Sequence, residues 1–408
     1  MEWEGYLNAK AHRLFPSVIQ EMMQRASKPG VVSFTAGQPS GDLYPVDALR
    51  GAIDKTLHDA PELLAYPDSL GDAKLREWLA WWLKAQCVVP ESVTERNIVL
   101  TTGSQEGLSI AADLFISPGN AVIVEDPTYP EALLAFSREG AELLTVPFDD
   151  DGPDPEALER ILSTRRASFF YTIPTFQNPS GRSTTLGRKR EILDILRRHG
   201  TLLLEDDPYR FLWYDEMPDP PYAAVAGDGD RIISLGSFSK TVVPGIRCGW
   251  VILPERLVPK VAMLRLTFEI GLPTFLQRAV FSVVSGPSFA THLERLRQVY
   301  SERRNALSDA LARFTDNCGF SFPFPKGGFF IWGSAEGIDS LEFSRFAAEE
   351  ERVGVIPGSI FHVRPGDGTT FLRFSFATVS PEQSWEGAGR FARALERYHA
   401  GEGRVRSE

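Results

Sequence analysis

Two kinds of hydrophobic pattern alternate along much of the chain. Short apolar runs rich in β-branched and aromatic residues are typical of buried strands. Such runs occur at Ile98–Thr101, Ala121–Val124, Ser168–Tyr171, Thr201–Leu204, Arg231–Leu235 and Gly249–Leu253. Between them, helical spacing predicts helices over Gln105–Ile116, Pro130–Glu139, Asp154–Thr164 and Thr185–His199. This alternation predicts an α/β fold, with a mostly parallel sheet covered by helices on both faces.

The C-terminal part has a different pattern. Strands are predicted at Gly328–Trp332, Val353–Ile356 and Phe371–Phe376, between a long helix at about His292–Phe314 and a last helix at about Pro381–Tyr398. This order predicts a small α+β domain over 291–408, after a large domain over 46–290. Residues 1–45 hold one helix pattern, Pro16–Ala26, and a Gly/Pro-rich loop. We expect them to form an N-terminal arm that packs on the small domain or on a partner chain.

Charge and composition narrow the class of protein. The 408 residues carry a formal net charge of −11, which disfavours binding to nucleic acid or anionic membranes because both need a positive field. No apolar run approaches the ~18–20 residues that span a bilayer, and no secretory signal pattern is visible. Cys87, Cys248 and Cys318 are too few and too scattered for a disulfide framework or a zinc site. We therefore expect a cytoplasmic protein without nucleic-acid or membrane partners.

A lysine with two serines before it is the strongest chemical candidate. Ser237-Phe238-Ser239-Lys240 follows a predicted strand, and Arg247 comes seven residues after the lysine. A lysine amine can condense with an aldehyde cofactor, while hydroxyl groups and a guanidinium hold a phosphate. The alternative is a surface loop with a solvated lysine.

Acidic residues follow another predicted strand in the run Glu205-Asp206-Asp207-Pro208-Tyr209. Residues at the carboxyl end of a parallel strand face the ligand crevice. One carboxylate there could hold a protonated pyridine nitrogen and keep the ring an electron sink. Three consecutive acids could instead bind Mg²⁺, or form a solvated turn.

Three more polar side chains lie at positions where they could bind a ligand. Ser104 begins a predicted helix, whose N-terminus is an anion site, although an ordinary capped turn explains it as well. Asn178 lies in an Asn-Pro turn and could donate to a phenolate or carboxylate. Arg373 lies in an aromatic, strand-like run and needs an anion, either a bound carboxylate or a structural salt bridge.

The order of these motifs resembles one family. The chain is similar to the fold-type I aminotransferases that use pyridoxal 5′-phosphate (PLP), and most similar to the class I/II branch with 2-aminoadipate and kynurenine aminotransferases. The resemblance extends from about residue 30 to 395. It rests on Gly103-Ser104-Gln105, Glu125-Asp126-Pro127-Thr128-Tyr129, Gln177-Asn178-Pro179-Ser180-Gly181, Glu205-Asp206-Asp207-Pro208-Tyr209, Ser237-Phe238-Ser239-Lys240 and Phe371-Leu372-Arg373.

The resemblance implies roles for the cofactor-binding residues. Lys240 would bind PLP covalently and then carry the proton, Asp206 would hold the pyridine nitrogen, and Tyr209 would reach the ring's phenolic oxygen. These three are the expected catalytic residues. Further cofactor contacts are expected from Ser104, Gln105, Tyr129, Asn178, Ser237, Ser239 and Arg247, with Tyr129 stacked on the ring and the serines, Gln105 and Arg247 on the phosphate. No metal ion is implied.

The resemblance also implies a substrate and a partner. Arg373, with Asn178 and the Gly37 backbone, would bind the substrate α-carboxylate, next to the N-terminal arm. Tyr66 matches a tyrosine that reaches the phosphate in the other subunit, which implies a homodimer with shared active sites. The implied reaction is ping-pong transamination from an aromatic, branched-chain or 2-aminoadipate type α-amino acid to a 2-oxo acid, with 2-oxoglutarate the expected acceptor.

One loop departs from the branch's pattern, and other functions stay open. The loop over residues 36–45 is one residue shorter than usual and lacks its second proline, which leaves the substrate side chain undetermined. Arg13, Gln20 and Tyr44 are candidates for lining that pocket. The alternatives are another PLP reaction on the same fold, such as a lyase, decarboxylase or racemase, and, remotely, an aminotransferase-like regulator without catalysis.

Overall fold

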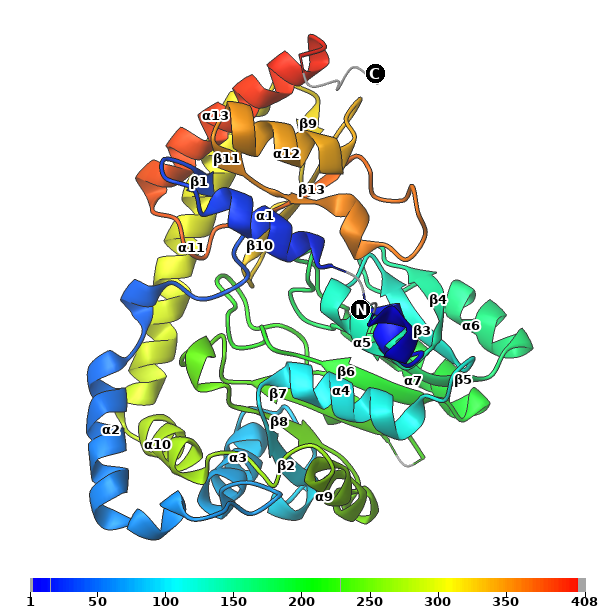
Figure 1. The fold of residues 1–408 in the computed structure, drawn as a ribbon, viewed down its shortest axis with the longest axis vertical. Coiled ribbons are helices and arrows are strands. Elements are labelled where there is room, and N and C mark those ends of the chain that lie inside the picture. The colour runs from blue at the N-terminus through cyan, green and yellow to red at the C-terminus, as the bar shows by residue number, and fades with distance from the viewer. Residues whose placement is uncertain (1–2, 15, 228, 403–408) are drawn as a thin grey trace.

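A seven-stranded sheet forms the centre of the larger part of the computed structural model, which describes residues 3–14, 16–227 and 229–402 (Figure 1). In spatial order its strands are β2 (Ile98–Thr101), β8 (Gly249–Ile252), β7 (Ile232–Ser237), β6 (Leu202–Asp206), β5 (Ala167–Thr172), β3 (Ala121–Asp126) and β4 (Glu142–Pro147). Only β8 runs antiparallel to its neighbours. The predicted mostly parallel sheet is confirmed.

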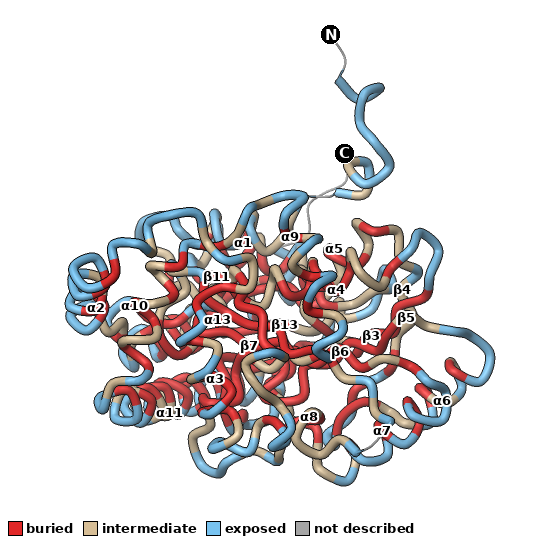
Figure 2. Tube along the Cα trace, turned by 90° about the horizontal axis from the view of Figure 1, so that it is seen from below, coloured by how far each residue is buried: buried red, intermediate tan, exposed pale blue. Residues whose placement is uncertain are grey.

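The sheet is buried on both faces, as expected for parallel strands between helices. In β5, Phe169 and Tyr171 pack into one hydrophobic cluster and Phe170 packs into another on the opposite side, because successive side chains of a strand alternate between faces. The middle of the molecule is accordingly buried and its outer helices are exposed (Figure 2). Continuous apolar runs such as Leu202–Leu204 are therefore explained by two-sided burial.

Helices cover the two faces of this sheet. One face packs against α4 (Ser104–Phe115), α5 (Pro130–Arg138) and α9 (Val258–Leu266). The other face packs against α6 (Pro155–Thr164), α7 (Leu186–His199) and the short α8 (Tyr222–Val225). Both predicted helix-covered faces are present.

Local sequence signals set the ends of these helices. The Asp154 side chain accepts from the backbone N–H of Ala157 and caps α6, and Thr185 caps α7 in the same way. Gly200 ends α7 with a left-handed φ of 64°, which glycine adopts without a steric penalty. The helix boundaries expected from the sequence therefore lie within about two residues of the observed ones.

The smaller part of the chain is built on a four-stranded antiparallel sheet. Its strands in spatial order are β12 (Ile356–Pro357), β13 (Phe371–Ser375), β10 (Phe330–Ala335) and β9 (Phe320–Ser321). A two-stranded parallel sheet pairs β1 (Val32–Ser33) with β11 (Val353–Gly354). The helices of this part are α1 (Val18–Ala26), α11 (Ser288–Thr315), α12 (Ser340–Glu350) and α13 (Pro381–His399).

The long helix α11 connects the two parts of the molecule (Figure 1). Its one end packs along α13 and its other end lies near α10. The remaining helices, at the lower end of α11 in Figure 1, are α2 (Val46–Asp59), α3 (Ala73–Ala85) and α10 (Thr274–Val284). The division at residues 45 and 290 stays a prediction, and residues 1–2 and 403–408 of the predicted outer segments lie outside the described residues.

Three observed strands are absent from the predicted set, and one predicted strand is divided. Strands β1 and β9 have two residues each, too few to leave an apolar run in the sequence. Strand β4 is absent from the predicted set because it lies at the sheet edge, where its side chains are mostly half-buried and form no continuous apolar run. The predicted strand Val353–Ile356 is two short strands, β11 and β12, which pair with β1 and β13 in different sheets. Local pattern alone does not reveal such a change of partner.

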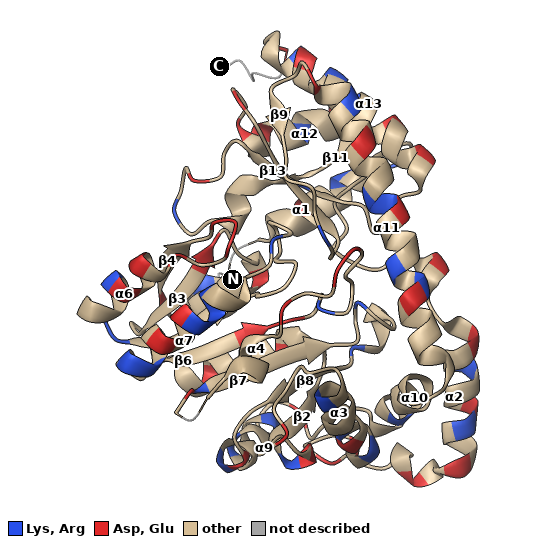
Figure 3. Cartoon of the chain, turned by 180° about the vertical axis from the view of Figure 1, so that it is seen from behind, with Lys and Arg blue, Asp and Glu red and all other residues tan. Residues whose placement is uncertain are grey.

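Charged residues lie mainly on the outer helices. Figure 3 shows both signs interspersed along α2, α11 and α13, whereas the central strands are largely free of them. Within the described residues, no helix is long and apolar enough to cross a membrane.

Candidate active site

A cavity of about 280 Å³ opens at the carboxyl ends of β6 and β7. The predicted residues that line it are Gly37, Ser104, Gln105, Tyr129, Asn178, Asp206, Tyr209, Ser237, Ser239, Lys240, Arg247 and Arg373. They come from segments more than 300 residues apart in the sequence. Tyr66 does not line this cavity, and its side chain is 85% exposed.

The Lys240 amine lies inside the cavity. It follows β7 and donates a hydrogen bond to the carbonyl oxygen of Gly37, at 2.7 Å. Burial, together with the guanidinium groups of Arg247 and Arg373, lowers the pKa of Lys240 to about 8. A fraction of the amine is therefore neutral near physiological pH, as a nucleophile or a base requires.

Asp206 is buried opposite this amine, at the end of β6. Tyr171 donates its hydroxyl to Oδ2 at 3.2 Å, whereas Oδ1 is buried without a hydrogen-bond partner within the described chain. Burial raises the pKa of Asp206 to about 7. A buried carboxylate oxygen without a donor is costly, so the cavity is suited to a ligand that brings a charged N–H group.

The three consecutive acids do not converge on one metal ion. Glu205 and Asp206 are neighbours in β6 and point to opposite faces of the sheet. Glu205 accepts hydrogen bonds from the backbone N–H of Tyr222 at 2.6 Å and from Ser234 at 3.0 Å, while Asp207 lies beside Arg210. The Mg²⁺ alternative for this run is therefore wrong.

A second group of side chains forms an anion cradle. Ser104 is the first residue of α4, where backbone N–H groups are unpaired. The hydroxyl groups of Ser237 and Ser239 lie 2.9 Å apart, and Arg247 Nη1 donates to Ser239 Oγ at 3.4 Å. Arg247 adopts a left-handed φ of 56°, a strained conformation that often occurs at functional sites. The cradle has the donor set that a phosphate dianion requires.

Arg373 lies in β13 and is buried among aromatic rings. Its guanidinium donates to Asn178 Oδ1 at 2.9 Å and to the Thr35 carbonyl at 3.0 Å, and it lies 4.3 Å from the Phe330 ring centre. Its hydrogen bonds within the described chain reach no carboxylate, and Glu131 acts on it through charge alone. Burial lowers the pKa of Arg373 to about 10. The described chain thus gives Arg373 no salt bridge, and an anionic ligand stays the expected partner of this guanidinium.

Two tyrosines and a glutamine complete the predicted set. Tyr129 immediately precedes α5, and Tyr209 is buried with its ring centre 5.6 Å from Lys240 Nζ. Gln105 donates to the carbonyl oxygen of Glu131 at 3.3 Å. The phenol groups are neutral at physiological pH, because burial raises the pKa of both tyrosines.

Sequence comparison assigns the chain to a family. The profile described as "Aminotransferase class I and II" matches residues 29–391. The chain belongs to this aminotransferase family. The enzyme therefore uses PLP, and the cavity fits this group: the cradle suits its phosphate, and the unpaired Asp206 oxygen suits its protonated ring nitrogen.

Individual relatives are similar to this aminotransferase over almost its whole length. A 2-aminoadipate transaminase of Thermus thermophilus is 33% identical over 97% of this chain and 98% of its own. Aromatic-amino-acid aminotransferase 1 of Thermococcus litoralis is 31% identical, with 97% and 95% covered. The HTH-type regulator YisV of Bacillus subtilis is 29% identical over 93% of this chain, which covers 77% of that protein.

Solved structures are similar in fold. The α-aminoadipate aminotransferase LysN from T. thermophilus, complexed with N-(5′-phosphopyridoxyl)-L-leucine, superposes with a TM-score of 0.90 at 32% identity, and 98% and 100% of the two chains are covered. A multiple substrate aminotransferase from Thermococcus profundus gives a TM-score of 0.92 at 28% identity, with 98% and 100% covered. The predicted fold type I is confirmed.

Part of the lining was missed or misplaced by sequence reasoning. Arg13 instead donates to the Arg138 carbonyl, and Tyr44 donates to the Pro39 carbonyl. Gln20 is exposed and outside the lining, so none of these three candidates is confirmed. The lining residues missed are Ile19, Met23, Gln38, Glu131, Ile173, Pro208 and Pro244. The i,i+4 spacing of Ile19 and Met23 on a predicted helix was an available signal.

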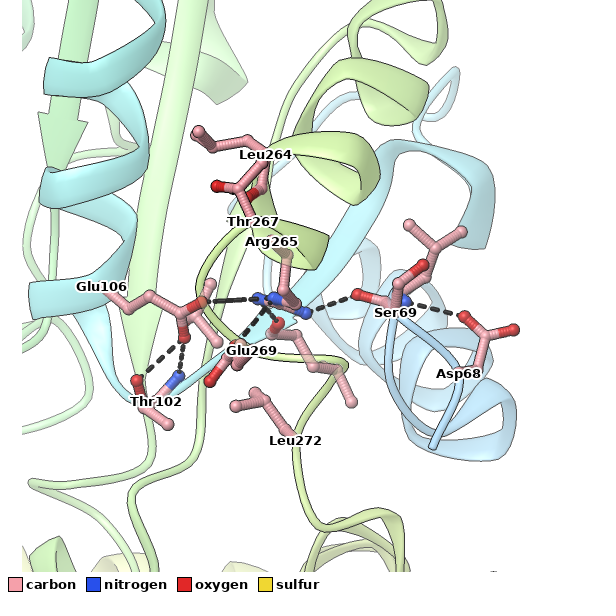
Figure 4. A network of polar contacts seen from close by, with 12 residues as sticks. Asp68, Ser69, Thr102, Glu106, Leu264, Arg265, Thr267, Glu269 and Leu272 are labelled. Carbon is pink, nitrogen blue, oxygen red and sulfur yellow. Dashed lines mark hydrogen bonds and ion pairs between the residues drawn. The ribbon is translucent and has the colours of Figure 1, made fainter. Parts of the chain in front are cut away.

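A buried arginine organises the backbone beside the anion cradle (Figure 4). Arg265 of α9 is fully buried and donates to Glu106 Oε1 at 2.8 Å. The other oxygen of Glu106 accepts from the backbone N–H and the hydroxyl of Thr102, at 2.5 and 2.8 Å. Glu106 thereby fixes the turn that leads into Ser104.

The same arginine reaches two other backbone segments. It donates to the carbonyl oxygens of Ser69 at 2.5 Å and Leu100 at 2.7 Å. Arg265 therefore ties the end of β2 and the cradle turn to the loop that carries Tyr66.

We expect Arg265→Met to lower the free energy of unfolding by about 3–5 kcal/mol, because it leaves Glu106 buried without a cation. Urea denaturation measures the change. Arg165→Met, at an exposed ion pair with Glu142, is the control and should leave the midpoint close to that of the unaltered enzyme. Equal midpoints for both variants would contradict this account of the network.

Proposed function

We propose that this aminotransferase moves the amino group of an α-amino acid to a 2-oxo acid by a ping-pong reaction. The observation that carries the proposal is the pairing, in one cavity, of the Lys240 amine with the unpartnered Asp206 oxygen, beside a phosphate-type cradle. Each group alone fits several chemistries. Together they match the charge pattern of PLP, which combines an aldehyde, a basic ring nitrogen and a phosphate.

The residues that would hold the cofactor follow from this pattern. Lys240 would bind its aldehyde carbon, and Asp206 would accept from its ring nitrogen. Tyr209 and Asn178 would reach the ring oxygen, and Tyr129 would stack on the ring. The proposed phosphate ligands are Ser104, Gln105, Ser237, Ser239 and Arg247. When bound, PLP supplies an electron sink for the charge that is left by removal of the substrate's α-proton.

The chain's own groups would bind the substrate and move the proton. Arg373 would bind the α-carboxylate, because a planar guanidinium matches two carboxylate oxygens, and the Gly37 backbone and Asn178 would help to orient it. Lys240 would take the α-proton, for which a pKa of about 8 is well suited. Release of a 2-oxo acid and entry of a second one complete the cycle.

A homodimer with shared sites is part of the proposal. Apolar side chains exposed around Tyr66 include those of Leu64, Met263, Leu266, Phe268 and Ile270. The two segments are neighbours, since Arg265 reaches the Ser69 carbonyl. Large exposed apolar patches favour a protein partner. Tyr66 would then extend to the phosphate in the partner subunit.

Several finer points remain predictions. The donor stays open among aromatic, branched-chain and 2-aminoadipate types: two relatives are named for 2-aminoadipate and for aromatic amino acids, and the T. thermophilus structure contains a phosphopyridoxyl-leucine adduct. The family resemblance makes 2-oxoglutarate the expected acceptor. Cytoplasmic location is likewise a prediction. Another PLP reaction is the second candidate, since Lys240, Asp206 and Arg373 would serve several. A panel of amino acids with 2-oxo acid acceptors distinguishes them: turnover that no acceptor accelerates would exclude transamination.

We expect PLP to be attached covalently through Lys240. The enzyme should absorb visible light when loaded, and borohydride should fix PLP to the peptide that contains this lysine. Lys240→Ala should abolish both signals, whereas Lys28→Ala, at an exposed position, should retain them. Mass spectrometry of the reduced peptides makes the assignment. PLP fixed at a lysine other than Lys240 in the unaltered enzyme would refute it.

We expect Arg373→Ala to lower kcat/KM for every α-amino acid alike, since a charge-assisted pair worth about 2–5 kcal/mol is lost. Arg373→Lys should retain part of the activity because it keeps the charge without the bidentate geometry. The spectral change of the bound cofactor in single-turnover mixing measures both. An effect confined to one amino acid would argue against α-carboxylate binding.

We expect Tyr66→Phe to speed up loss of PLP, because it removes a hydroxyl that reaches the partner's site. Tyr6→Phe, at an equally exposed tyrosine, is the matched control. Dialysis followed by cofactor absorbance measures retention, and sedimentation velocity measures the oligomeric state. A fully active monomer would rule out the shared site.

A further inference from the structure

One charged side chain in the cavity has no part in the proposed reaction. Among the described residues that line the cavity, the charged ones are Lys240, Arg247, Arg373, Asp206 and Glu131. The first four are accounted for by the cofactor and by the substrate α-carboxylate. Glu131 remains, and no cation of the described lining is left over.

Glu131 is held in place from its backbone. It is the second residue of α5, directly after Tyr129 and Pro130, and its carbonyl oxygen accepts from Gln105 at 3.3 Å. Its carboxylate oxygen Oε2 is buried and has no hydrogen-bond partner within the described chain. The Tyr129 hydroxyl acts on this carboxylate, while Oε2 keeps an open acceptor position that a ligand's donor group can satisfy.

The surroundings of Glu131 belong to the substrate end of the cavity. Burial raises the pKa of Glu131, while its own backbone N–H, attraction to Arg373, a hydrogen bond with Tyr129 and attraction to Lys240 oppose that rise. Ile19 and Met23 of α1, four residues apart, contribute an apolar wall to the same cavity. An amino acid bound through Arg373 at its α-carboxylate and close to Lys240 at its α-carbon thus has its side chain in a space bounded by apolar groups and one carboxylate.

We propose that Glu131 is a specificity residue that favours amino donors whose side chain ends in a hydrogen-bond donor, such as an amide, hydroxyl or ammonium group, and rejects side chains that end in a carboxylate. The proposal rests on the proposed function and names its substrate class. A donor group satisfies the unpaired oxygen, whereas a second carboxylate meets a like charge with no spare cation.

This substrate class differs from the one for which a relative is named. The relative that is 33% identical is named for 2-aminoadipate, a dicarboxylic amino acid. The cavity of the present chain offers one guanidinium for the α-carboxylate and an acid where a second carboxylate would need a cation. By the same reasoning, monocarboxylic 2-oxo acids should be better acceptors than 2-oxoglutarate, so this proposal replaces the 2-aminoadipate and 2-oxoglutarate expectations that come from the family resemblance.

The test compares glutamine and glutamate, which differ by an amide in place of a carboxylate. Holoenzyme is mixed with each amino acid, and kcat/KM for the first half-reaction is read from the spectral change of the bound cofactor. We expect glutamine to be preferred about tenfold or more, because like charges held together in a site are strongly unfavourable. Glu131→Gln should reduce the glutamine-to-glutamate ratio by about tenfold or more, and Glu131→Ala should change it in the same direction.

The glutamine-to-glutamate ratio is measured on a single enzyme variant. A general loss of activity or stability affects both values equally and therefore does not change the ratio. Glu142→Gln, at an exposed glutamate of β4, is the control and should keep the original ratio. Alanine, which has no functional side chain, is the reference donor. If alanine reacts but the ratio is unchanged in Glu131→Gln, the selectivity proposal is overturned alone. If no amino acid reacts, the proposed function fails as well. A preference of the unaltered enzyme for glutamate would show that a cation from outside this lining reaches the side chain, and would also overturn it.

Discussion

Charge that is buried without a protein partner is the constraint on which this site depends. Asp206 Oδ1 makes no hydrogen bond in the described chain, and the hydrogen bonds of Arg373 go to Asn178 and the Thr35 carbonyl rather than to a carboxylate. Burying a polar or charged group without a partner is unfavourable. We propose that both groups gain their missing interactions from ligands, Asp206 from a cationic N–H group and Arg373 from an anion. The cavity would thus suit a cofactor with a cationic ring nitrogen beside Asp206 and a substrate with an anionic carboxylate beside Arg373.

The contrast with the neighbouring buried charges supports this view. Glu125 accepts from Thr172, from the Ile173 N–H at 3.1 Å and from Gln177 at 3.2 Å. Burial raises its pKa to about 8, yet its oxygens are satisfied by the fold. Arg265 is likewise paired inside the protein with Glu106. Glu125 and Arg265 hold loops in place, whereas Asp206 and Arg373 line the cavity. Asp207 also lacks a hydrogen-bond partner in the described chain but does not line the cavity. An unpaired buried charge therefore indicates a ligand site only where it also faces a cavity.

The sequence predicted those parts of the fold and site that local pattern determines. Asp206 was distinguishable because it ends a continuous apolar run, and such strand ends meet at one edge of a parallel sheet. The edge strand β4 was not predicted, because its half-buried side chains leave a mixed pattern of apolar and polar residues. Ile19, Met23 and Glu131 escaped for another reason. Their placement depends on how α1 and α5 pack around the cavity. The i,i+4 spacing of Ile19 and Met23 marks an apolar face of a helix, but it does not show which cavity that face lines. The exposure of Tyr66 is compatible with the proposed contact to a second chain, which no single-chain pattern determines.

The central claim is that Asp206 holds a positively charged ring nitrogen. Its most direct measurement is the ¹⁵N chemical shift of enzyme loaded with PLP that is labelled at the ring nitrogen. We predict a protonated ring nitrogen at neutral pH in the unaltered enzyme, because the ionised carboxylate of Asp206 stabilises the N–H cation. That cation in turn opposes the rise in the pKa of Asp206 that burial causes. We predict loss of the nitrogen's proton in Asp206→Asn. An unprotonated nitrogen in the unaltered enzyme, or a shift that Asp206→Asn does not change, would contradict the claim.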